Sequence, residues 1–151
     1  MKALMFGWEF PPHILGGLGT ASYGLTKGMY DCGDMDITFV IPKPWGDEEK
    51  GFAHIIGANT TPIAWRDVNA DYVQSRIGHV MSPQLYFDLR NHIYSDFNYM
   101  NTNDLGCIEF SGRYPENLVE EINNYSIVAG VIARTVPCDV IHSHDWLTYP
   151  A

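Results

Sequence analysis

The stretch Val136-Pro-Cys-Asp-Val-Ile-His-Ser-His-Asp-Trp146 decides the fold class of this chain. Its apolar centre predicts a short buried strand over Asp139–His142, and polar side chains follow directly after that strand. In open α/β sheets, ligands bind outside the carboxyl ends of the strands. The stretch therefore predicts both a sheet strand and a candidate ligand site at its end.

The first third of the chain predicts a β-α-β unit. Lys2–Phe6 and Asp36–Ile41 are short and apolar, as is typical of buried strands. Between them, Thr20 or Ser22 is expected to cap a helix that runs to about Tyr30. A strand, a crossover helix and a second strand imply two parallel strands.

The last third continues this alternation of strands and helices. Pro115–Val136 carries apolar residues at helical spacing and ends at Pro137, so it predicts the clearest helix. Another helix is expected to begin near Trp146 or Leu147. We predict an α/β fold with a Rossmann-like, doubly wound parallel sheet, in which the first and fourth major strands are neighbours.

The middle of the chain gives weaker patterns. Phe52–Ala58 and Pro62–Trp65 are expected to be short strands that pair with each other. Pro83–Met100 is expected to be helical in places, and Asn101–Gly112 to be a loop.

Composition narrows the class of protein. The chain has 151 residues, 46% of them hydrophobic, which suits one domain with a sizeable core. The chain has a net charge of −9, and its sequence contains no cluster of basic residues. A nucleic-acid surface and an anionic membrane partner are therefore disfavoured. The N-terminus predicts neither a signal peptide nor a membrane span. Cys32, Cys107 and Cys138 are widely separated, which favours free thiols in a reducing compartment and a cytoplasmic location.

A glycine-rich segment, Gly16-Gly17-Leu18-Gly19, lies between the first strand and the first helix. Glycines there would let a phosphate approach the backbone N–H groups of the helix; alternatively, they serve a tight turn with positive φ. No Gly-Lys-Ser/Thr follows, which excludes a Walker loop. Ser22 replaces the third glycine of a dinucleotide fingerprint, and no acid ends the second strand. A nucleotide diphosphate is therefore favoured over NAD.

The two histidines at i and i+2 share one face of the predicted strand. His142 is expected to be a core residue bonded to backbone, and His144 to contact a sugar or phosphate. Asp145 is expected to cap the next helix and Trp146 to pack under it. The remaining histidines lack ligand spacing, so no metal site is predicted.

Together these motifs resemble one family, the retaining glycosyltransferases built from two facing Rossmann-like (GT-B type) domains, and in particular the glycogen/starch synthase branch. The residues that carry the resemblance are Pro11-Pro12, Gly16-Gly17-Leu18-Gly19 and the segment from Asp139 to Trp146. They lie at both ends of the chain, in the family's order and separation. The region Gly46 to Gly112 matches the family poorly.

The resemblance implies transfer of a hexose, glucose above all, from ADP-glucose or UDP-glucose to an α-glucan or related acceptor, with retention and without a cofactor. It implies a catalytic contact for His144, and substrate binding by Gly16, Gly17, Leu18, Gly19, His142 and Asp145. Starch synthases usually carry a Lys two residues before the first glycine of the loop, where this chain has Ile14. The choice of donor therefore stays open. The alternative is a non-catalytic nucleotide- or carbohydrate-binding α/β module.

The resemblance also bears on domain organisation. In this family the second domain supplies most nucleotide contacts, including a Lys/Arg pair on the phosphates. Residues 1–151 contain no such segment. We therefore expect this chain to be an incomplete N-terminal, acceptor-side domain, without the nucleotide-sugar-binding domain and inactive alone.

Overall fold

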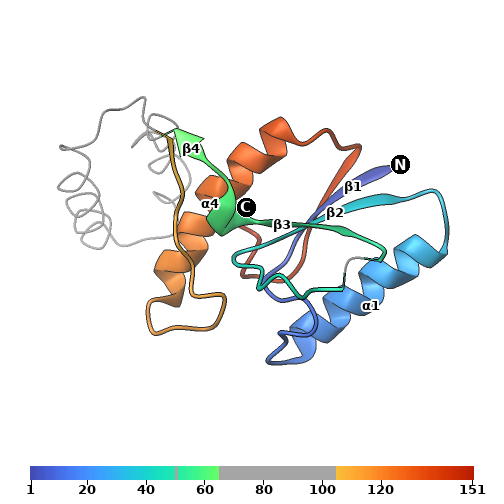
Figure 1. Ribbon diagram of the computed structural model, residues 1–151, viewed down its shortest axis with the longest axis horizontal. Helices are drawn as coiled ribbons and strands as arrows, with labels where there is room; N and C mark the ends of the chain where they lie inside the picture. Colours follow the sequence, from blue (N-terminus) through green and yellow to red (C-terminus); the bar gives the residue numbers. More distant parts are fainter. Residues whose placement is uncertain (50, 65–104) are drawn as a thin grey trace. The chain divides into compact units, whose positions relative to one another are not determined.

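The computed structural model describes residues 1–49, 51–64 and 105–151 (Figure 1). The chain divides into two units, Met1–Thr61 with Cys107–Ala151, and Pro62–Gly106. In the second unit, β4 (Ile63–Ala64) pairs antiparallel with β5 (Leu105–Gly106), so the expected loop over Asn101–Gly112 contains a strand. The helical stretch expected at Pro83–Met100 lies outside the described residues.

The first unit is organised by a parallel sheet. Its strands are β1 (Lys2–Phe6), β2 (Asp36–Ile41), β3 (His54–Gly57) and β6 (Val140–Ser143), in the order β3-β2-β1-β6. All three pairings in this sheet are parallel. The α/β class and the adjacency of the first and fourth major strands are thereby confirmed.

The expected pairing of the two middle strands is wrong. β3 extends the parallel sheet beside β2, with Val40 opposite Ile56, whereas β4 pairs with β5. The 3₁₀ turn η1 (Ala58–Thr60) separates β3 from β4. The two segments were expected to form a hairpin because they are close in sequence. β3 instead forms its backbone hydrogen bonds with the free edge of β2.

The helices α1 (Gly17–Asp31) and α4 (Leu118–Thr135) lie on opposite faces of this sheet (Figure 1). Alternation along the strands explains the two faces. Met5 belongs to a core cluster against which Tyr23 of α1 packs. Its neighbour Phe6 points the other way and meets the ring of Tyr125 on α4, with ring centroids 6.3 Å apart.

The ends of three expected helices differ from the structure. α1 begins at Gly17 instead of Thr20 or Ser22, because the extended Gly16 (φ −161°) already serves as its N-cap. α4 begins at Leu118, three residues after Pro115. The helix expected after Asp145 is only a turn over 146–150, in which the Thr148 N–H donates to the Asp145 carbonyl (3.0 Å).

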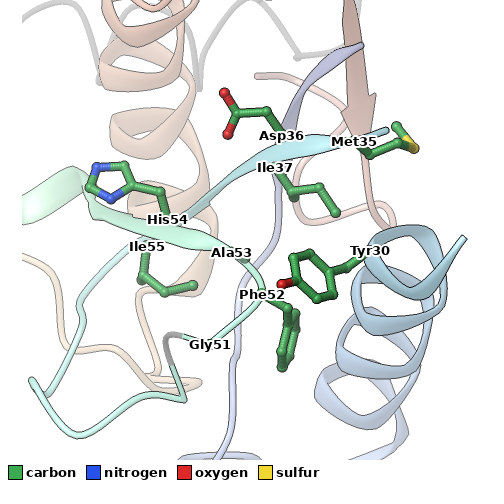
Figure 2. A pocket seen from close by; sticks show the side chains of 9 residues that line it. All are labelled: Tyr30, Met35, Asp36, Ile37, Gly51, Phe52, Ala53, His54 and Ile55. Atoms are coloured by element: carbon green, nitrogen blue, oxygen red, sulfur yellow. The ribbon is translucent and has the colours of Figure 1, made fainter. Parts of the chain in front are cut away.

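A cavity of about 380 Å³ opens at the amino ends of β2 and β3 (Figure 2). Figure 2 shows Phe52, Ile55 and Tyr30 on its α1 side, while the side chains of Asp36 and His54 turn to the other face of the sheet. The cavity thus lies at the sheet edge opposite the predicted site. No helix among the described residues is long and apolar enough to cross a membrane.

Candidate functional site

The site is set by the point where the strand order reverses. β2 and β3 extend the sheet on one side of β1, and β6 lies on its other side. In open α/β sheets, the loops that leave the carboxyl ends of two such strands diverge, and ligands bind between them. The His144 N–H still donates to the Phe6 carbonyl (2.9 Å), which fixes the start of the second loop beside the first.

The loop after β1 is built into the protein core. Trp8, Glu9 and Phe10 are each at most 4% exposed. The Trp8 indole N–H donates to the carbonyl of Arg113 (3.1 Å), which ties this loop to the segment before α4. The buried Tyr125 hydroxyl bonds to the carbonyls of Gly7 (3.0 Å) and Val40 (2.9 Å). These contacts fix the loop that leads into the first turn of α1.

The glycines of this loop serve two different needs. A Cβ added at Gly19 would lie 2.0 Å from Cγ2 of Ile14 and 2.9 Å from a carboxylate oxygen of Glu9, so packing requires glycine there. At Gly16 and Gly17 an added Cβ would meet nothing within 4 Å. None of these three residues has a positive φ, which excludes the alternative of a left-handed tight turn. Close approach of a ligand to the backbone is the remaining explanation for having glycine at positions 16 and 17.

The N-terminus of α1 offers N–H groups at this point. Its N-cap has no side-chain hydrogen bond, and its first turn has no acidic residue. Within the described ranges, no hydrogen bond satisfies the backbone N–H groups of Gly17, Leu18 and Gly19. The helix dipole adds positive potential at the same place, so the geometry suits an anion.

Glu9 is a polar residue of the site that our sequence reasoning missed. It is 4% exposed, and its Oε2 accepts the Leu15 N–H (3.2 Å). The pKa of the Tyr114 hydroxyl is raised by burial first, then by a hydrogen bond to Glu9, and further by the charge of Asp145. Tyr114 therefore lies near a carboxylate of each loop, Glu9 after β1 and Asp145 after β6. The available signal was that Glu9 is the only acid between Lys2 and Tyr30.

The two histidines lie side by side, as their spacing predicts. Nε2 of His142 is 3.4 Å from Nδ1 of His144, and both residues are half-buried. The expected core position of His142, bonded to backbone, is not what the structure has: its ring contacts His144. No third His, Cys, Asp or Glu completes a metal site with them in the part of the chain that the structure describes.

The His144 imidazole is held in its neutral form. Burial lowers its pKa from the ordinary 6.5, and the neighbouring His142 lowers that pKa further, against a smaller raising effect of Asp145. A neutral imidazole has one N–H donor and one acceptor nitrogen. His144 can therefore hydrogen-bond a sugar hydroxyl at neutral pH without adding a charge.

The expected roles of Asp145 and Trp146 are wrong. Asp145 has a positive φ of 73°, whereas an N-cap residue is normally extended, and its Oδ1 accepts the N–H of Trp146 (2.7 Å). Trp146 is 56% exposed and packs under no helix, because the segment after Asp145 is a turn. The carboxylate of Asp145 is near enough to Tyr114 for its charge to raise the pKa of that hydroxyl.

The family is established by comparison with known proteins. The model of the starch synthase catalytic domain matches residues 2–151. The chain belongs to this family of glycogen/starch synthase glycosyltransferases, and its parallel sheet agrees with the family's N-terminal Rossmann-like domain. No curated protein and no solved structure gave a significant match.

Proposed function

We propose that the protein to which this chain belongs transfers glucose from ADP-glucose or UDP-glucose to an α-glucan, with retention. The observation that carries the proposal is the open backbone at Gly16 and Gly17. Neither packing nor positive φ requires glycine there, and the N–H groups of the following turn have no protein partner among the described residues. A leaving diphosphate gains negative charge, which such a helix N-terminus stabilises.

His144 lies on the neighbouring strand end, and we assign it a contact with the donor sugar near the reacting carbon. A neutral His144 can bond a hydroxyl, and the Glu9 carboxylate lies beside the first turn of α1. Gly16, Gly17, Leu18 and Gly19 would lie on the diphosphate. His142 would support His144, and Asp145 would face the sugar.

Residues 1–151 are proposed to be the acceptor-side domain and to require a nucleotide-sugar domain for turnover. The test has two parts. The purified chain is mixed with each donor and glycogen, and we expect no release of nucleoside diphosphate; measurable turnover would refute this requirement. Joined to a nucleotide-sugar domain, the chain should elongate glycogen, and binding without transfer would instead support a non-catalytic module.

Gly17→Val tests the diphosphate contact itself. An added Cβ at Gly17 meets no protein atom within 4 Å, so we expect near-normal stability and a loss of transfer. Gly28→Val is the matched control, since Gly28 lies in the same helix with equally open surroundings but far from its N-terminus. Equal activity of the two variants would remove the phosphate role.

A further inference from the structure

The carboxylate of Glu9 lies beside the first turn of α1. Glu9 is 4% exposed, and its Oε2 accepts the Leu15 N–H (3.2 Å). The same oxygen is 2.9 Å from the position that a Cβ on Gly19 would take, so the carboxylate reaches this turn. The second oxygen, Oε1, is buried and has no hydrogen-bond partner among the residues that the structure describes. A buried carboxylate with an unused oxygen thus lies next to the N–H groups that we assign to the diphosphate.

No ion pair neutralises Glu9 in the described part of the chain. Residues 3–26 contain no Lys or Arg, and the one ion pair in the described ranges is His13–Asp47 (2.7 Å). The Tyr114 hydroxyl responds to the uncompensated carboxylate, because its pKa is raised by burial first, then by a hydrogen bond to Glu9 and by the charge of Glu9. The first turn of α1 therefore offers hydrogen-bond donors without an excess of positive charge.

Two basic side chains lie on other loops, where acidic residues offset them. Lys43 Nζ lies 5.1 Å and Arg113 Cζ 5.8 Å from the ring centroid of Trp45. The His13 ring lies against the same indole, with ring centroids 5.1 Å apart. The turn that carries Trp45 also carries the three acidic residues at positions 47–49. These loops therefore add no net positive charge that would cancel the charge of the Glu9 carboxylate.

The charge of the diphosphate changes during the proposed transfer. In the donor, each phosphate carries about one negative charge, because a second bond replaces its other ionisable hydroxyl. Transfer breaks the bond between glucose C1 and the diphosphate oxygen, which keeps the electron pair. The acceptor hydroxyl oxygen bonds to C1 and its proton is released. The terminal phosphate of the product then carries about −1.5 to −2 charges at neutral pH, so donor and product differ by nearly one charge.

We propose that Glu9 selects against the product: its carboxylate repels the nucleoside diphosphate more than the nucleotide-diphosphate sugar, and so favours product release. This inference rests on the proposed function. The N–H groups of Gly17 and Leu18 hold phosphate oxygens through short-range hydrogen bonds, whereas repulsion by Glu9 grows with the charge of the ligand. At a separation of about 10 Å and an effective dielectric constant of about 20, one unit charge changes affinity on the order of 10-fold. Product release limits the rate of many enzymes.

The test follows the amide of Gly17 by NMR in the ¹⁵N-labelled chain, with ADP and ADP-glucose titrated separately at neutral pH in metal-free buffer. Glu9→Gln keeps an oxygen that can accept the Leu15 N–H and removes the charge. In this variant ADP should bind about 5-fold more tightly or better, and ADP-glucose should gain less. Unchanged ADP affinity would overturn the proposal. Weaker binding of ADP-glucose alone would also overturn it, because that result indicates a hydrogen bond from a sugar hydroxyl to Glu9.

Glu121→Gln is the matched control. Glu121 is also a buried carboxylate (7% exposed) that accepts a backbone N–H, from Ser111 (2.9 Å), but it lies in the first turn of α4, on the opposite face of the sheet from α1. Both affinities should stay unchanged in this variant. An equal gain in Glu9→Gln and Glu121→Gln would show that only the overall charge matters and would overturn the proposal.

A second pair of variants covers the case in which Glu9→Gln does not fold. Thr20→Glu adds a carboxylate to the exposed surface of the same turn, and Thr20→Gln is its neutral match. Thr20→Glu should weaken ADP more than ADP-glucose, and an equal effect on both ligands would overturn the proposal. If neither ligand shifts Gly17 in the unmodified chain, the diphosphate contact itself is wrong and this inference is overturned with it. A shift of Gly17 with unchanged ADP affinity in Glu9→Gln overturns this inference alone.

Discussion

The two loops at the candidate site, one after β1 and one after β6, differ in how they are anchored. Trp8 in the first loop is 2% exposed and bonded to Arg113, whereas Trp146 in the second is 56% exposed. The first loop is continuous with the core and fixes the glycines of α1. The second begins on the sheet at His144, exposes Trp146 and then buries Leu147 and Thr148. Both loops follow a buried strand and begin with the same kind of sequence pattern. The structure nevertheless buries the tryptophan of the first loop and exposes that of the second.

The largest expected effect is the contrast between the two tryptophans. Trp8→Ala should lower the free energy of unfolding by about 3–5 kcal/mol, because a large buried ring is lost. Trp146→Ala should change it by less than about 0.5 kcal/mol. Urea denaturation measures both. If Trp8→Ala does not fold, Trp8→Phe measures the loss of the hydrogen bond to Arg113 together with the smaller ring, and similar costs for both tryptophans would contradict the comparison.

Next in size is the effect of His144→Ala on transfer. In the enzyme with its nucleotide-sugar domain, we expect the rate to fall by roughly 100- to 1,000-fold, the usual cost of one positioned polar contact. His142→Ala should cost less. Steady-state rates with either donor give the comparison, and circular dichroism checks the fold. Near-normal rates in His144→Ala, with activity abolished in a folded His142→Ala, would reverse the two roles.

Within the glycine loop, the same substitution should have opposite consequences two residues apart. Gly19→Ala should cost about 1–3 kcal/mol of stability, since its Cβ overlaps Ile14 and crowds Glu9. Gly17→Ala should leave stability unchanged or slightly raised, because alanine favours helix. Thermal unfolding of both variants measures the difference. A stable Gly19→Ala would show that the first loop is less rigid than its burial implies.

The smallest expected effect concerns pH. The pKa of His144 lies below its ordinary 6.5 in the folded chain, so the unfolded chain takes up this proton more readily. Stability should therefore decrease as the pH falls from neutral through the lowered pKa and then become constant. His144→Gln should remove this part of the pH dependence. An unchanged difference between the two proteins across that range would indicate an unshifted imidazole.

Sequence reasoning succeeded where a local pattern determines the structure. Lys2–Phe6 and Asp36–Ile41 are strands with the expected bounds, and the helical spacing after Pro115 identifies α4. The start of α1 was placed too late because glycines were read as loop residues. The buried Glu9 was missed because its burial depends on packing by α1 and Tyr114, which no local pattern records.

The side chains around Trp45 show a second limit of sequence reasoning. His13, Lys43 and Arg113 are far apart in sequence, and only the parallel sheet brings their loops to one edge. The prediction that Trp146 packs under a helix was wrong for a related reason. Its helix depended on the path of the backbone beyond Asp145, and the positive φ of that residue redirects it.

The hydroxyl of Tyr125 has a mechanical consequence. It is bonded at once to the ends of two neighbouring strands, through the carbonyls of Gly7 and Val40, at the point where their loops separate. A shift of α4 along the sheet would separate the buried hydroxyl from both carbonyls, although the Val40 carbonyl would keep the hydrogen bond from the Gly7 N–H. The hydroxyl therefore couples α4 to both strand ends, and we expect these three parts to move together. Hydrogen exchange at the amide of Gly7, which donates to Val40 (2.9 Å), should accordingly be among the slowest in the chain.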